Sequence, residues 1–198
     1  MDSIEYYDRY AVPYYEETVE LSMEEQLNRF IELLPENAEV LDLGCGSGRD
    51  TLYLDEEGFS VTAMDGSAKM CELAEIHTGK EVLHLRAEEM EFDDVFHGIW
   101  ACSVLGHFPP DKMQQVMEKI LDALKEDGIL YFSVRRGDRD GRYNGRYYYD
   151  YSRSSLEELL ESFKEIEILE IWKTDDARGE NYENQWYNVL VKKTRSED

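Results

Sequence analysis

One stretch, residues 40–51, constrains the fold of this chain more than any other. It reads Val-Leu-Asp-Leu-Gly-Cys-Gly-Ser-Gly-Arg-Asp-Thr: a short apolar run that one acid, Asp42, interrupts, and then three glycines at alternate positions. A segment with helical spacing follows and stops at Gly58. The pattern predicts a strand, a glycine turn and a helix, in that order. Glycine permits the positive φ of such a bend and leaves room for a ligand, and the unpaired amides of the helix favour an anionic group there.

A second acid stands where an adenosine ligand would need it. Residues 59–64 are predicted to form the next strand, Asp65 ends it, and Gly66 and Ser67 follow. An acidic side chain at the tip of the second strand is placed to accept hydrogen bonds from both hydroxyls of a ribose. The glycine loop has the form G-x-G-x-G, whereas nicotinamide-dependent dehydrogenases need G-x-G-x-x-G. The spacing therefore argues against an oxidoreductase of that class.

Segments 40–51 and 58–67 together resemble those of the class I S-adenosylmethionine-dependent methyltransferases, whose motif I has this glycine spacing. The resemblance covers almost the whole chain, which is most similar to small bacterial methyltransferases of the tellurite-resistance type. It implies a Rossmann-like α/β fold, a three-layer sandwich around a seven-stranded, mostly parallel sheet with its last strand antiparallel. It also implies S-adenosylmethionine as the methyl donor and S-adenosylhomocysteine as the product.

The size and net charge of the chain limit the kinds of partner that it is expected to bind. A chain of 198 residues is expected to form a single domain. Its net charge of −24 repels nucleic acids and anionic membranes, because phosphate binding needs Lys and Arg to displace counterions. No apolar run could span a bilayer, the start is too charged for a signal peptide, and three distant cysteines suggest neither disulfides nor a metal. We expect a cytoplasmic monomer or homodimer that acts on a small molecule, without nucleic acid, membrane or metal.

The rest of the pattern alternates strands and helices. Ser22 with Glu25, and Ser155 with Glu158, are predicted to form capping boxes at the starts of two helices. Residues 135–153 are expected to form a long polar connection. The last two strands are expected to form a hairpin at the sheet edge. Further strands are predicted at residues 81–85, 98–103, 129–134, 165–172 and 186–192, and further helices at 49–57, 67–77 and 110–124.

The resemblance assigns a cofactor site to the strand ends. It implies that Asp65 binds the ribose, with helix capping as the alternative, and that Asp42 either binds cofactor or orders the loop. The family usually places an acid against the adenine amino group, but Arg86 stands at that position, so Glu88 or the backbone near Ala87 is expected to serve. Met70 is expected to pack on the adenine or in the core. The residues expected to contact the cofactor are Asp42, Gly44, Cys45, Gly46, Gly48, Arg49, Asp50, Asp65, Gly66, Ser67, Met70, Ala87, Glu88, Ser103 and Tyr10.

Arginine and tyrosine are distributed unevenly. Residues 135–153 hold six of the twelve arginines against three aspartates, and ten of the fourteen tyrosines lie in residues 6–15 or 143–151. In the family, the N-terminal segment and the connection after the fifth strand both cover the active site. We therefore expect residues 1–21 and 135–153 to meet as a lid, which Arg178 from the closing hairpin also reaches. An anionic substrate is expected to contact Arg135, Arg146, Tyr6 and Tyr147; alternatively, the arginines neutralise the acidic surface.

Methyl transfer from a sulfonium is an in-line displacement for which the protein supplies position, desolvation and sometimes a base. His107, which follows the fourth strand, and Tyr147 are the candidate catalytic residues, although a lone histidine there can also be structural. The chain lacks the Asn/Asp-Pro-Pro-Tyr signature of enzymes that methylate nucleic-acid amines. A small-molecule methyltransferase is the leading interpretation. The alternatives are a protein methyltransferase and a regulatory module that binds S-adenosylmethionine or S-adenosylhomocysteine without catalysis.

Overall fold

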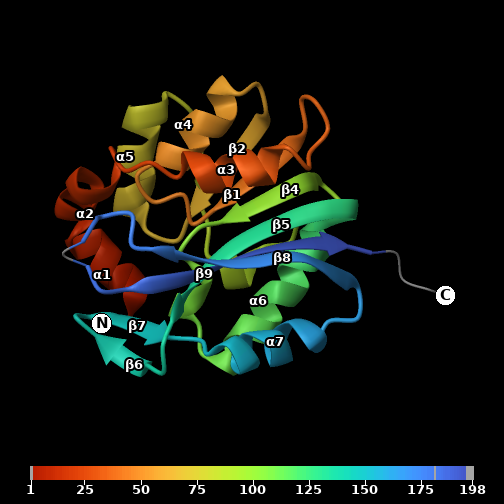
Figure 1. The fold of residues 1–198 in the computed structure, drawn as a ribbon. Coiled ribbons are helices and arrows are strands. Elements are labelled where there is room, and N and C mark those ends of the chain that lie inside the picture. Colours follow the sequence, from red (N-terminus) through yellow and green to blue (C-terminus); the bar gives the residue numbers. More distant parts are fainter. Residues whose placement is uncertain (1, 181, 195–198) are drawn as a thin grey trace.

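A seven-stranded sheet forms the middle layer of the fold (Figure 1). The computed structural model describes residues 2–180 and 182–194. The strands of the sheet are β1 (Glu39–Leu43), β2 (Ser60–Asp65), β3 (Val82–His84), β4 (Phe96–Ala101), β5 (Leu124–Arg136), β8 (Ile166–Asp175) and β9 (Gln185–Lys193). Their order is β3-β2-β1-β4-β5-β9-β8; the first five pair in parallel, and β9 runs antiparallel to both of its neighbours. The predicted fold class, with its antiparallel last strand, is confirmed.

Helices cover both faces of the sheet. Figure 1 shows α3, α4 and α5 on one face and α6 and α7 on the other, while α1 and α2 lie beyond one end of the strands. No helix of the described residues is long and apolar enough to cross a membrane. The helices are α1 (Ser3–Arg9), α2 (Ala11–Thr18), α3 (Glu24–Ile31), α4 (Arg49–Glu56), α5 (Ala68–Thr78), α6 (Pro110–Ala123) and α7 (Arg153–Glu161), with short 3-10 turns η1 (Ala87–Glu89) and η2 (Leu105–His107).

The two faces of the sheet build separate cores, because successive side chains of a strand point to opposite faces. On the α3 side, Trp100 of β4 stacks on Tyr131 of β5 with 3.8 Å between ring centroids, and Phe30 of α3 packs against Trp100. On the other side, α6 lays one apolar face on the sheet, with Met113, Val116, Met117, Ile120 and Leu121 all buried. This spacing of three and four residues is what makes α6 an amphipathic helix.

The connection between β5 and α7 is more ordered than its polar sequence suggested. It contains a β-hairpin of β6 (Asp140–Tyr143) and β7 (Arg146–Tyr149). Asn144 and Gly145, both with positive φ, form the turn, and Asn-Gly is the pair that two-residue hairpins of this kind favour. The long polar connection expected here therefore contains a hairpin that was not predicted, although an Asn-Gly pair between two tyrosine-containing runs is a hairpin signal.

Both predicted capping boxes were also wrong. Helix α3 begins at Glu24 after Met23, without a side-chain cap, and Glu25 instead pairs with Arg29 one turn later at 3.2 Å. Helix α7 begins at Arg153, where Ser152 and Ser155 form the capping box in place of Ser155 and Glu158. At α3 the Ser22 hydroxyl accepts the Glu24 amide at 3.3 Å instead of that of Glu25, and at α7 the helix begins earlier than expected, so that Ser155 is the third helical residue and not the cap.

Gly98 of β4 lies where α3 approaches the sheet most closely. A Cβ at this position would lie 2.7 Å from the Phe30 ring and 2.9 Å from Leu34. Gly98→Ala is therefore expected to lower the free energy of unfolding by about 1–3 kcal/mol through overpacking, as measured by urea denaturation. Gly106→Ala is the control, because its Cβ would first meet a backbone oxygen at 3.7 Å. Equal stability of the two variants would contradict this account of the α3 contact.

Candidate active site

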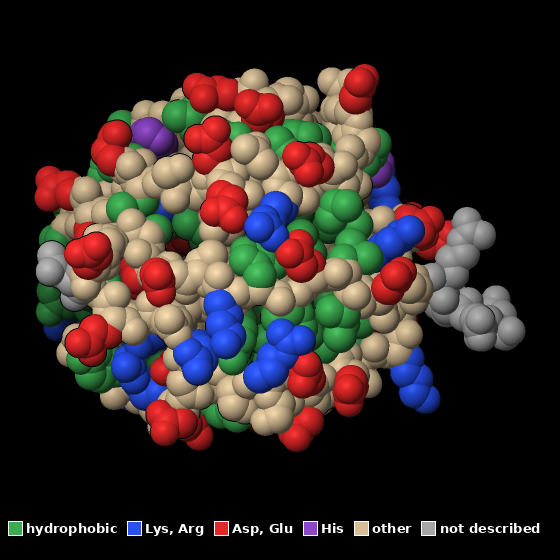
Figure 2. All heavy atoms as spheres, viewed as in Figure 1, with side chains coloured by type: hydrophobic (Ala, Val, Ile, Leu, Met, Phe, Trp, Pro, Cys, Tyr) green, Lys and Arg blue, Asp and Glu red, His purple; other side chains and the backbone are tan. Residues whose placement is uncertain are grey.

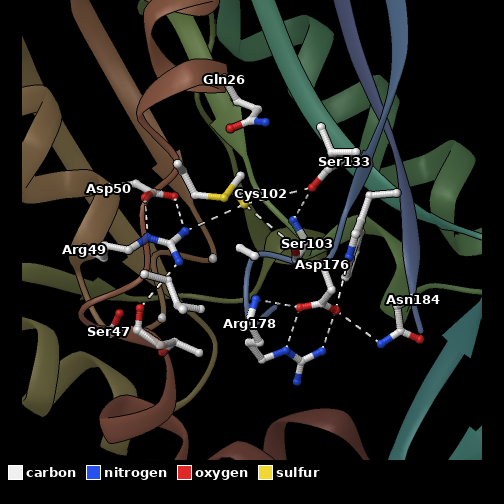
Figure 3. A pocket seen from close by; sticks show the side chains of 18 of the residues that line it. Gln26, Ser47, Arg49, Asp50, Cys102, Ser103, Ser133, Asp176, Arg178 and Asn184 are labelled. Atoms are coloured by element: carbon white, nitrogen blue, oxygen red, sulfur yellow. Dashed lines mark hydrogen bonds and ion pairs between the residues drawn. The ribbon is translucent and has the colours of Figure 1, made fainter. Parts of the chain in front are cut away.

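Two adjoining cavities open at the carboxyl ends of the parallel strands. The first, of about 400 Å³, is the arginine cavity, into which Arg49, Arg135, Arg146 and Arg178 all project. The second, of about 440 Å³, is the β2 cavity, which Asp65 at the end of β2 lines together with mainly apolar residues. Figure 3 shows part of the arginine cavity, with Arg49 and Arg178 reaching in from opposite sides. Seven residues line both cavities: Tyr7, Tyr14, Gly44, Gly46, Cys102, Ser103 and His107.

The glycine loop forms the floor between the cavities. The amides of Gly44 and Cys45 donate to the Met64 carbonyl at 2.9 and 3.0 Å, which holds the loop against the end of β2. A Cβ on Gly44 would lie 2.7 Å from Val104, so the residue must be glycine for the chain after β4 to pack there. Gly46, with a φ of 55°, has only the Tyr14 ring within reach of such a Cβ, at 3.7 Å. Its backbone therefore faces cavity space that a ligand can enter.

Asp65 is oriented by the loop it faces. Its Oδ2 accepts a hydrogen bond from the Gly46 amide at 3.0 Å and its Oδ1 accepts one from the Ser67 amide at 2.8 Å. Burial raises the pKa of this carboxyl, while the two amides act in the opposite direction. Each carboxylate oxygen can accept a further hydrogen bond. The group is thus fixed at the wall of the β2 cavity with acceptor capacity remaining.

A buried polar network supports the loop from beneath. Arg49 donates to both oxygens of Asp50, at 2.6 and 2.9 Å, and Trp100 Nε1 donates to the same carboxylate at 2.8 Å. Thr51 Oγ1 donates to Asp42 Oδ2 at 2.5 Å. Burial and the nearby Asp50 carboxylate raise the pKa of Asp42 to about 8. Asp42 therefore lies at the floor of the arginine cavity as a carboxyl that retains its proton near neutral pH.

The raised pKa of Asp42 predicts a pH dependence of stability. Folding moves its pKa from 3.8 to about 8, so the stabilisation is fully present below pH 3.8 and is lost as the pH rises through 8. Between pH 5 and 7, the wild type should lose about 1 kcal/mol of unfolding free energy per pH unit relative to Asp42→Asn, which has no proton to lose. Urea denaturation at several pH values measures this difference, and parallel profiles for the two proteins would contradict it.

Helix α1 lies across the rim of the β2 cavity. Asp8 accepts hydrogen bonds from the Ser67 hydroxyl at 2.7 Å and from the Lys69 amide at 3.2 Å, at the start of α5. Asp2 pairs with Arg86 at 3.5 Å. Ser67 is thereby committed to capping α5, since its hydroxyl also accepts from the Met70 amide at 3.1 Å. Ser67 and Arg86 thus tie the N-terminal helix to the edge of the cavity.

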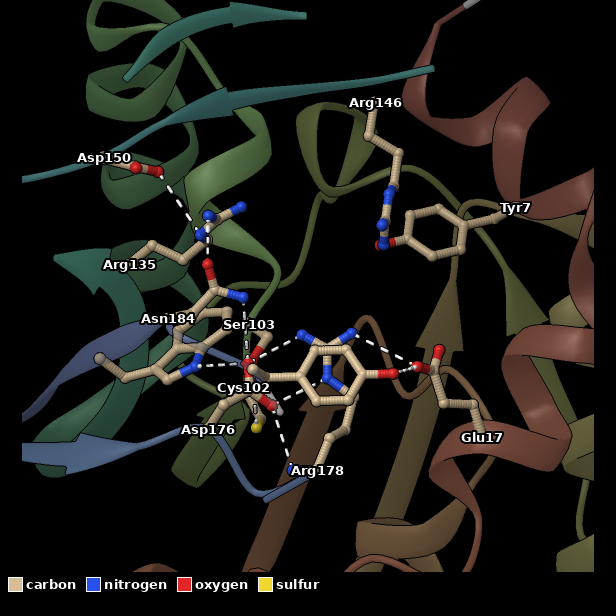
Figure 4. Close-up of polar contacts among 12 residues, drawn as sticks. Tyr7, Glu17, Cys102, Ser103, Arg135, Arg146, Asp150, Asp176, Arg178 and Asn184 are labelled. Carbon is tan, nitrogen blue, oxygen red and sulfur yellow. Dashed lines mark hydrogen bonds and ion pairs between the residues drawn. The ribbon is translucent and has the colours of Figure 1, made fainter. Parts of the chain in front are cut away.

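The two tyrosine-rich segments are in contact. The Tyr147 amide of β7 donates to Ser3 Oγ at 3.1 Å, and Arg146 Nη1 donates to the Tyr7 hydroxyl at 3.4 Å. The Arg146 guanidinium also lies 4.6 Å from the centroid of the Tyr6 ring. Figure 4 shows Arg146 beside Tyr7, which belongs to α1. The expected reach of Arg178 is seen as well: it lies 3.6 Å from Glu17 of α2.

The arginines of the cavity differ in their partners. Arg135 is 6% exposed, donates to Asn184 Oδ1 at 2.5 Å and lies 3.7 Å from Asp150. Arg178 is held by Asp176 at 2.7 Å; although burial opposes it, the hydrogen bonds from Arg178 lower the pKa of Asp176 to about 2. Within residues 2–180 and 182–194, Arg146 pairs with no carboxylate, and its Nε has no hydrogen-bond partner. Its guanidinium lies against the rings of Tyr6, Tyr7 and Tyr148 and donates to the Tyr7 hydroxyl.

His107 lies at the junction of the cavities and is held on both sides. Its Nδ1 lies 2.8 Å from the Tyr147 carbonyl and its Nε2 lies 2.9 Å from the Tyr7 hydroxyl. A carbonyl can only accept, so Nδ1 carries the hydrogen and Nε2 accepts from Tyr7. Burial lowers the pKa of His107 to about 4, so the ring is neutral at pH 7. Tyr147 contributes its carbonyl here, while its hydroxyl donates to Asp140 at 2.6 Å.

Most of the residues predicted for the site line the cavities. Gly48, Ser67, Tyr10 and Tyr6 line neither, and Tyr10 is 41% exposed. Tyr7 and Tyr14 were missed individually, although the tyrosine cluster containing them was recognised. Of the predicted residues, those that line only the arginine cavity are Asp42, Cys45, Arg49, Asp50, Arg135 and Arg146. Those that line only the β2 cavity are Asp65, Gly66, Met70, Ala87, Glu88 and Tyr147. Those that line both cavities are Gly44, Gly46, Ser103 and His107.

Comparison with known proteins identifies the family. The model of a methyltransferase domain matches residues 15–188. The chain is 31% identical over 131 residues to a carboxy-S-adenosyl-L-methionine synthase of Campylobacter jejuni subsp. doylei, covering 63% of this chain and 54% of that one. It is 30% identical over 128 residues to a putative methyltransferase, YqeM, of Bacillus subtilis, covering 61% and 52%. The chain thus spans about half the length of the curated relatives it matches.

Solved structures show the same fold. The 1,6-didemethyltoxoflavin-N1-methyltransferase of Burkholderia thailandensis, solved with 1,6-didemethyltoxoflavin and S-adenosylhomocysteine bound, superposes with a TM-score of 0.75. It is 24% identical, and the match covers 94% of this chain and 86% of that one. The family model, the glycine loop and the sheet order agree: the chain belongs to the class I S-adenosylmethionine-dependent methyltransferases.

Proposed function

We propose that this chain transfers a methyl group from S-adenosylmethionine to a small anionic acceptor that binds in the arginine cavity. The observation that carries the proposal is Arg146, a partly buried cation without a carboxylate partner among the described residues, in a chain whose net charge is −24. On the face in Figure 2, acidic side chains are spread over the surface. A cation left unpaired amid so many acids favours an anionic ligand as its missing partner.

The β2 cavity fits the nucleoside half of the donor. Asp65 offers carboxylate oxygens to the ribose hydroxyls, and the partly apolar wall formed by Met70, Leu85 and Ala87 suits a flat base. The open backbone at Gly46 lets the chain of the donor pass into the arginine cavity. The bound donor supplies an electrophilic methyl group on sulfur. The residues shared by the two cavities would then surround that methyl group.

The arginine cavity fits the acceptor. Arg135 and Arg146 both lie against the Tyr148 ring, at 4.6 and 5.3 Å from its centroid, so stacking restricts how the two guanidinium groups can turn. Each has a buried Nε without a hydrogen-bond partner. Guanidinium groups held in this way bind carboxylates or other oxyanions with little loss of side-chain entropy. Tellurite, which the sequence resemblance suggested, belongs to this class of anions.

The expected in-line displacement depends more on the alignment of donor and acceptor than on catalytic side chains. Binding both reactants in adjoining cavities replaces a bimolecular encounter with an oriented one. The Burkholderia relative holds a small heterocycle together with S-adenosylhomocysteine, which supports a small acceptor for this chain as well. The absence of nucleic-acid partners, the cytoplasmic location and the monomeric or dimeric state stay predictions. The protein-methyltransferase and non-catalytic alternatives are separated from this proposal by the acceptor assay below.

Cofactor binding can be tested through Asp65. We expect S-adenosylhomocysteine to bind the wild type in a calorimetric titration and NAD not to bind. Asp65→Ala should weaken binding of S-adenosylhomocysteine by at least about tenfold, since hydrogen bonds to a charged group contribute roughly 1.5–3 kcal/mol. Asp55→Ala is the matched control, because Asp55 pairs with Lys80 at 2.7 Å and lines neither cavity. If Asp65→Ala binds S-adenosylhomocysteine as tightly as the wild type, the nucleoside does not bind at Asp65.

Acceptor binding can be tested through Arg146. Methyl transfer from labelled S-adenosylmethionine is measured on carboxylates, phosphates and oxyanions including tellurite, each beside a neutral analogue. For the best anion, Arg146→Gln should raise KM by about tenfold or more without changing the affinity for S-adenosylhomocysteine. Arg153→Gln is the control, because Arg153 comes from the same segment but pairs with Glu157 at 2.6 Å on the surface. If neutral analogues are methylated as fast as the anions, or if Arg146→Gln leaves KM unchanged, the acceptor need not be anionic and that part of the proposal is contradicted.

A further inference from the structure

We propose that Tyr7 and His107 form a proton-accepting pair for the methyl acceptor, and that the acceptor atom is therefore a hydroxyl oxygen. Within the proposed function, this inference adds the chemical class of the acceptor atom and a catalytic role for helix α1. The proposal rests on the 2.9 Å contact between the Tyr7 hydroxyl and His107 Nε2, at a point where both residues line both cavities.

The hydrogen bonds of the Tyr7–His107 pair set the direction in which a proton can move. Because Nδ1 donates to the Tyr147 carbonyl, the lone pair of Nε2 points at the Tyr7 hydroxyl. The same hydroxyl lies 3.4 Å from Arg146 Nη1, which can only donate. The Tyr7 oxygen therefore receives a hydrogen bond from the arginine and gives one to the histidine. A proton that reaches this oxygen from the cavity has a continuous path to Nε2.

Other polar groups at the junction are less suited to accept a proton. Burial raises the pKa of Tyr14 to about 12 and that of Cys102 to about 11, so both carry their protons at pH 7. Burial raises the pKa of Tyr7 as well, but Tyr7 has the His107 ring 2.9 Å away to take its proton. Asp65, in the β2 cavity, already accepts two backbone amides. His107 is the neutral base: burial first, and then the charges of Arg146 and Arg135, lower its pKa to about 4. An essential base must be unprotonated at the working pH, and His107 is.

A bound anion would make His107 more basic. The groups that face the ring are Tyr7 of α1, Arg135 of β5, and Arg146, the Tyr147 carbonyl and Tyr148 of β7. An anionic acceptor on the two arginines offsets the positive charge that disfavours the imidazolium. The donor also loses its positive charge on reaction, so a proton on His107 leaves the net charge of the site unchanged. An anionic acceptor, which needs a base to remove its proton, would thus also raise the basicity of His107.

Methyl transfer to a hydroxyl oxygen conserves atoms and charge. The acceptor oxygen uses a lone pair to form a bond to the methyl carbon while the carbon–sulfur bond breaks, and the bonding pair stays on sulfur in neutral S-adenosylhomocysteine. The proton of the acceptor hydroxyl passes to the Tyr7 oxygen, and the Tyr7 proton passes to His107 Nε2. His107 leaves the step as imidazolium and releases its proton to solvent when the products depart. No oxidant, reductant or metal takes part in this sequence.

The tautomer of His107 can be read without turnover. Long-range proton–nitrogen NMR spectra of the full chain, loaded with S-adenosylhomocysteine, should show His107 neutral at pH 7 with its hydrogen on Nδ1. In Tyr7→Phe, the Nε2 resonance should move downfield as the hydrogen bond is lost. The half-buried pair Tyr15 and His77, 3.4 Å apart between α2 and α5 and outside both cavities, is the internal control. A hydrogen on Nε2, a protonated ring at pH 7, or an unmoved Nε2 resonance in Tyr7→Phe would overturn the proposal.

Kinetics test the pair on the best acceptor from the anion assay. Tyr7→Phe keeps the ring against Arg146, so it should lower kcat by about 100-fold and leave KM and the affinity for S-adenosylhomocysteine within about twofold of the wild-type values. His107→Asn should lower kcat similarly and abolish the acidic limb of the pH–rate profile. Tyr15→Phe, from the control pair with His77, should leave all these quantities unchanged. If Tyr7→Phe and His107→Asn keep kcat near the wild-type value, the pair does not take the proton.

Different results would contradict the proposed function and the role of the Tyr7–His107 pair. A wild-type chain that neither binds S-adenosylhomocysteine nor methylates any anion contradicts the proposed function. A wild-type chain that does both, and whose best acceptor carries no proton on the methylated atom, contradicts only the role of the pair. An acceptor that is methylated on a hydroxyl, with the kinetic losses above, supports both.

Discussion

The carboxylate of Asp65 is the contact on which the arrangement of the active site depends. It joins the glycine loop after β1 to the start of α5 by accepting one amide from each. Two neighbouring strand ends thereby share one fixed negative group, at the place where the β2 cavity begins. Because the backbone amides rather than a long side chain hold this carboxylate, its position is set by the fold itself. In the proposed function, this carboxylate would orient the sugar of the donor.

The second level of organisation joins segments that are far apart in the sequence. Helix α1 contributes Tyr7, the turn after β4 contributes His107, and the hairpin after β5 contributes Arg146 and the Tyr147 carbonyl. The hairpin is fixed by its Asn-Gly turn and by its contact with Ser3. The polar side of the site is thus assembled from segments added to the strand ends, whereas Asp65, Gly66 and Met70 of the β2 cavity come from the end of β2 and the start of α5. This division explains why membership of the family does not identify the acceptor.

Sequence alone predicted the part of the site that local pattern controls. The strand, the glycines and Asp65 follow one another within residues 40–67, so spacing was enough to identify them. The pairing of Tyr7 with His107 joins residues one hundred positions apart, and no periodicity encodes it. Ser22 and Glu25 matched a capping pattern, but the Ser22 hydroxyl accepts the Glu24 amide and Glu25 pairs with Arg29. The Asn-Gly turn of the hairpin was readable and was overlooked.

Helix α1 combines a central role with a weak attachment. None of its residues is buried, and polar contacts such as Asp8 with Ser67 and Asp2 with Arg86 join it to the rim of the β2 cavity. An element held in this way can detach by local unfolding while the apolar core stays closed. Detachment would open the nucleoside side and withdraw Tyr7 from His107 in one movement. In the proposed binding mode, the seven residues of α1 would therefore act as a gate, and ligand exchange and proton transfer would belong to different states of that helix.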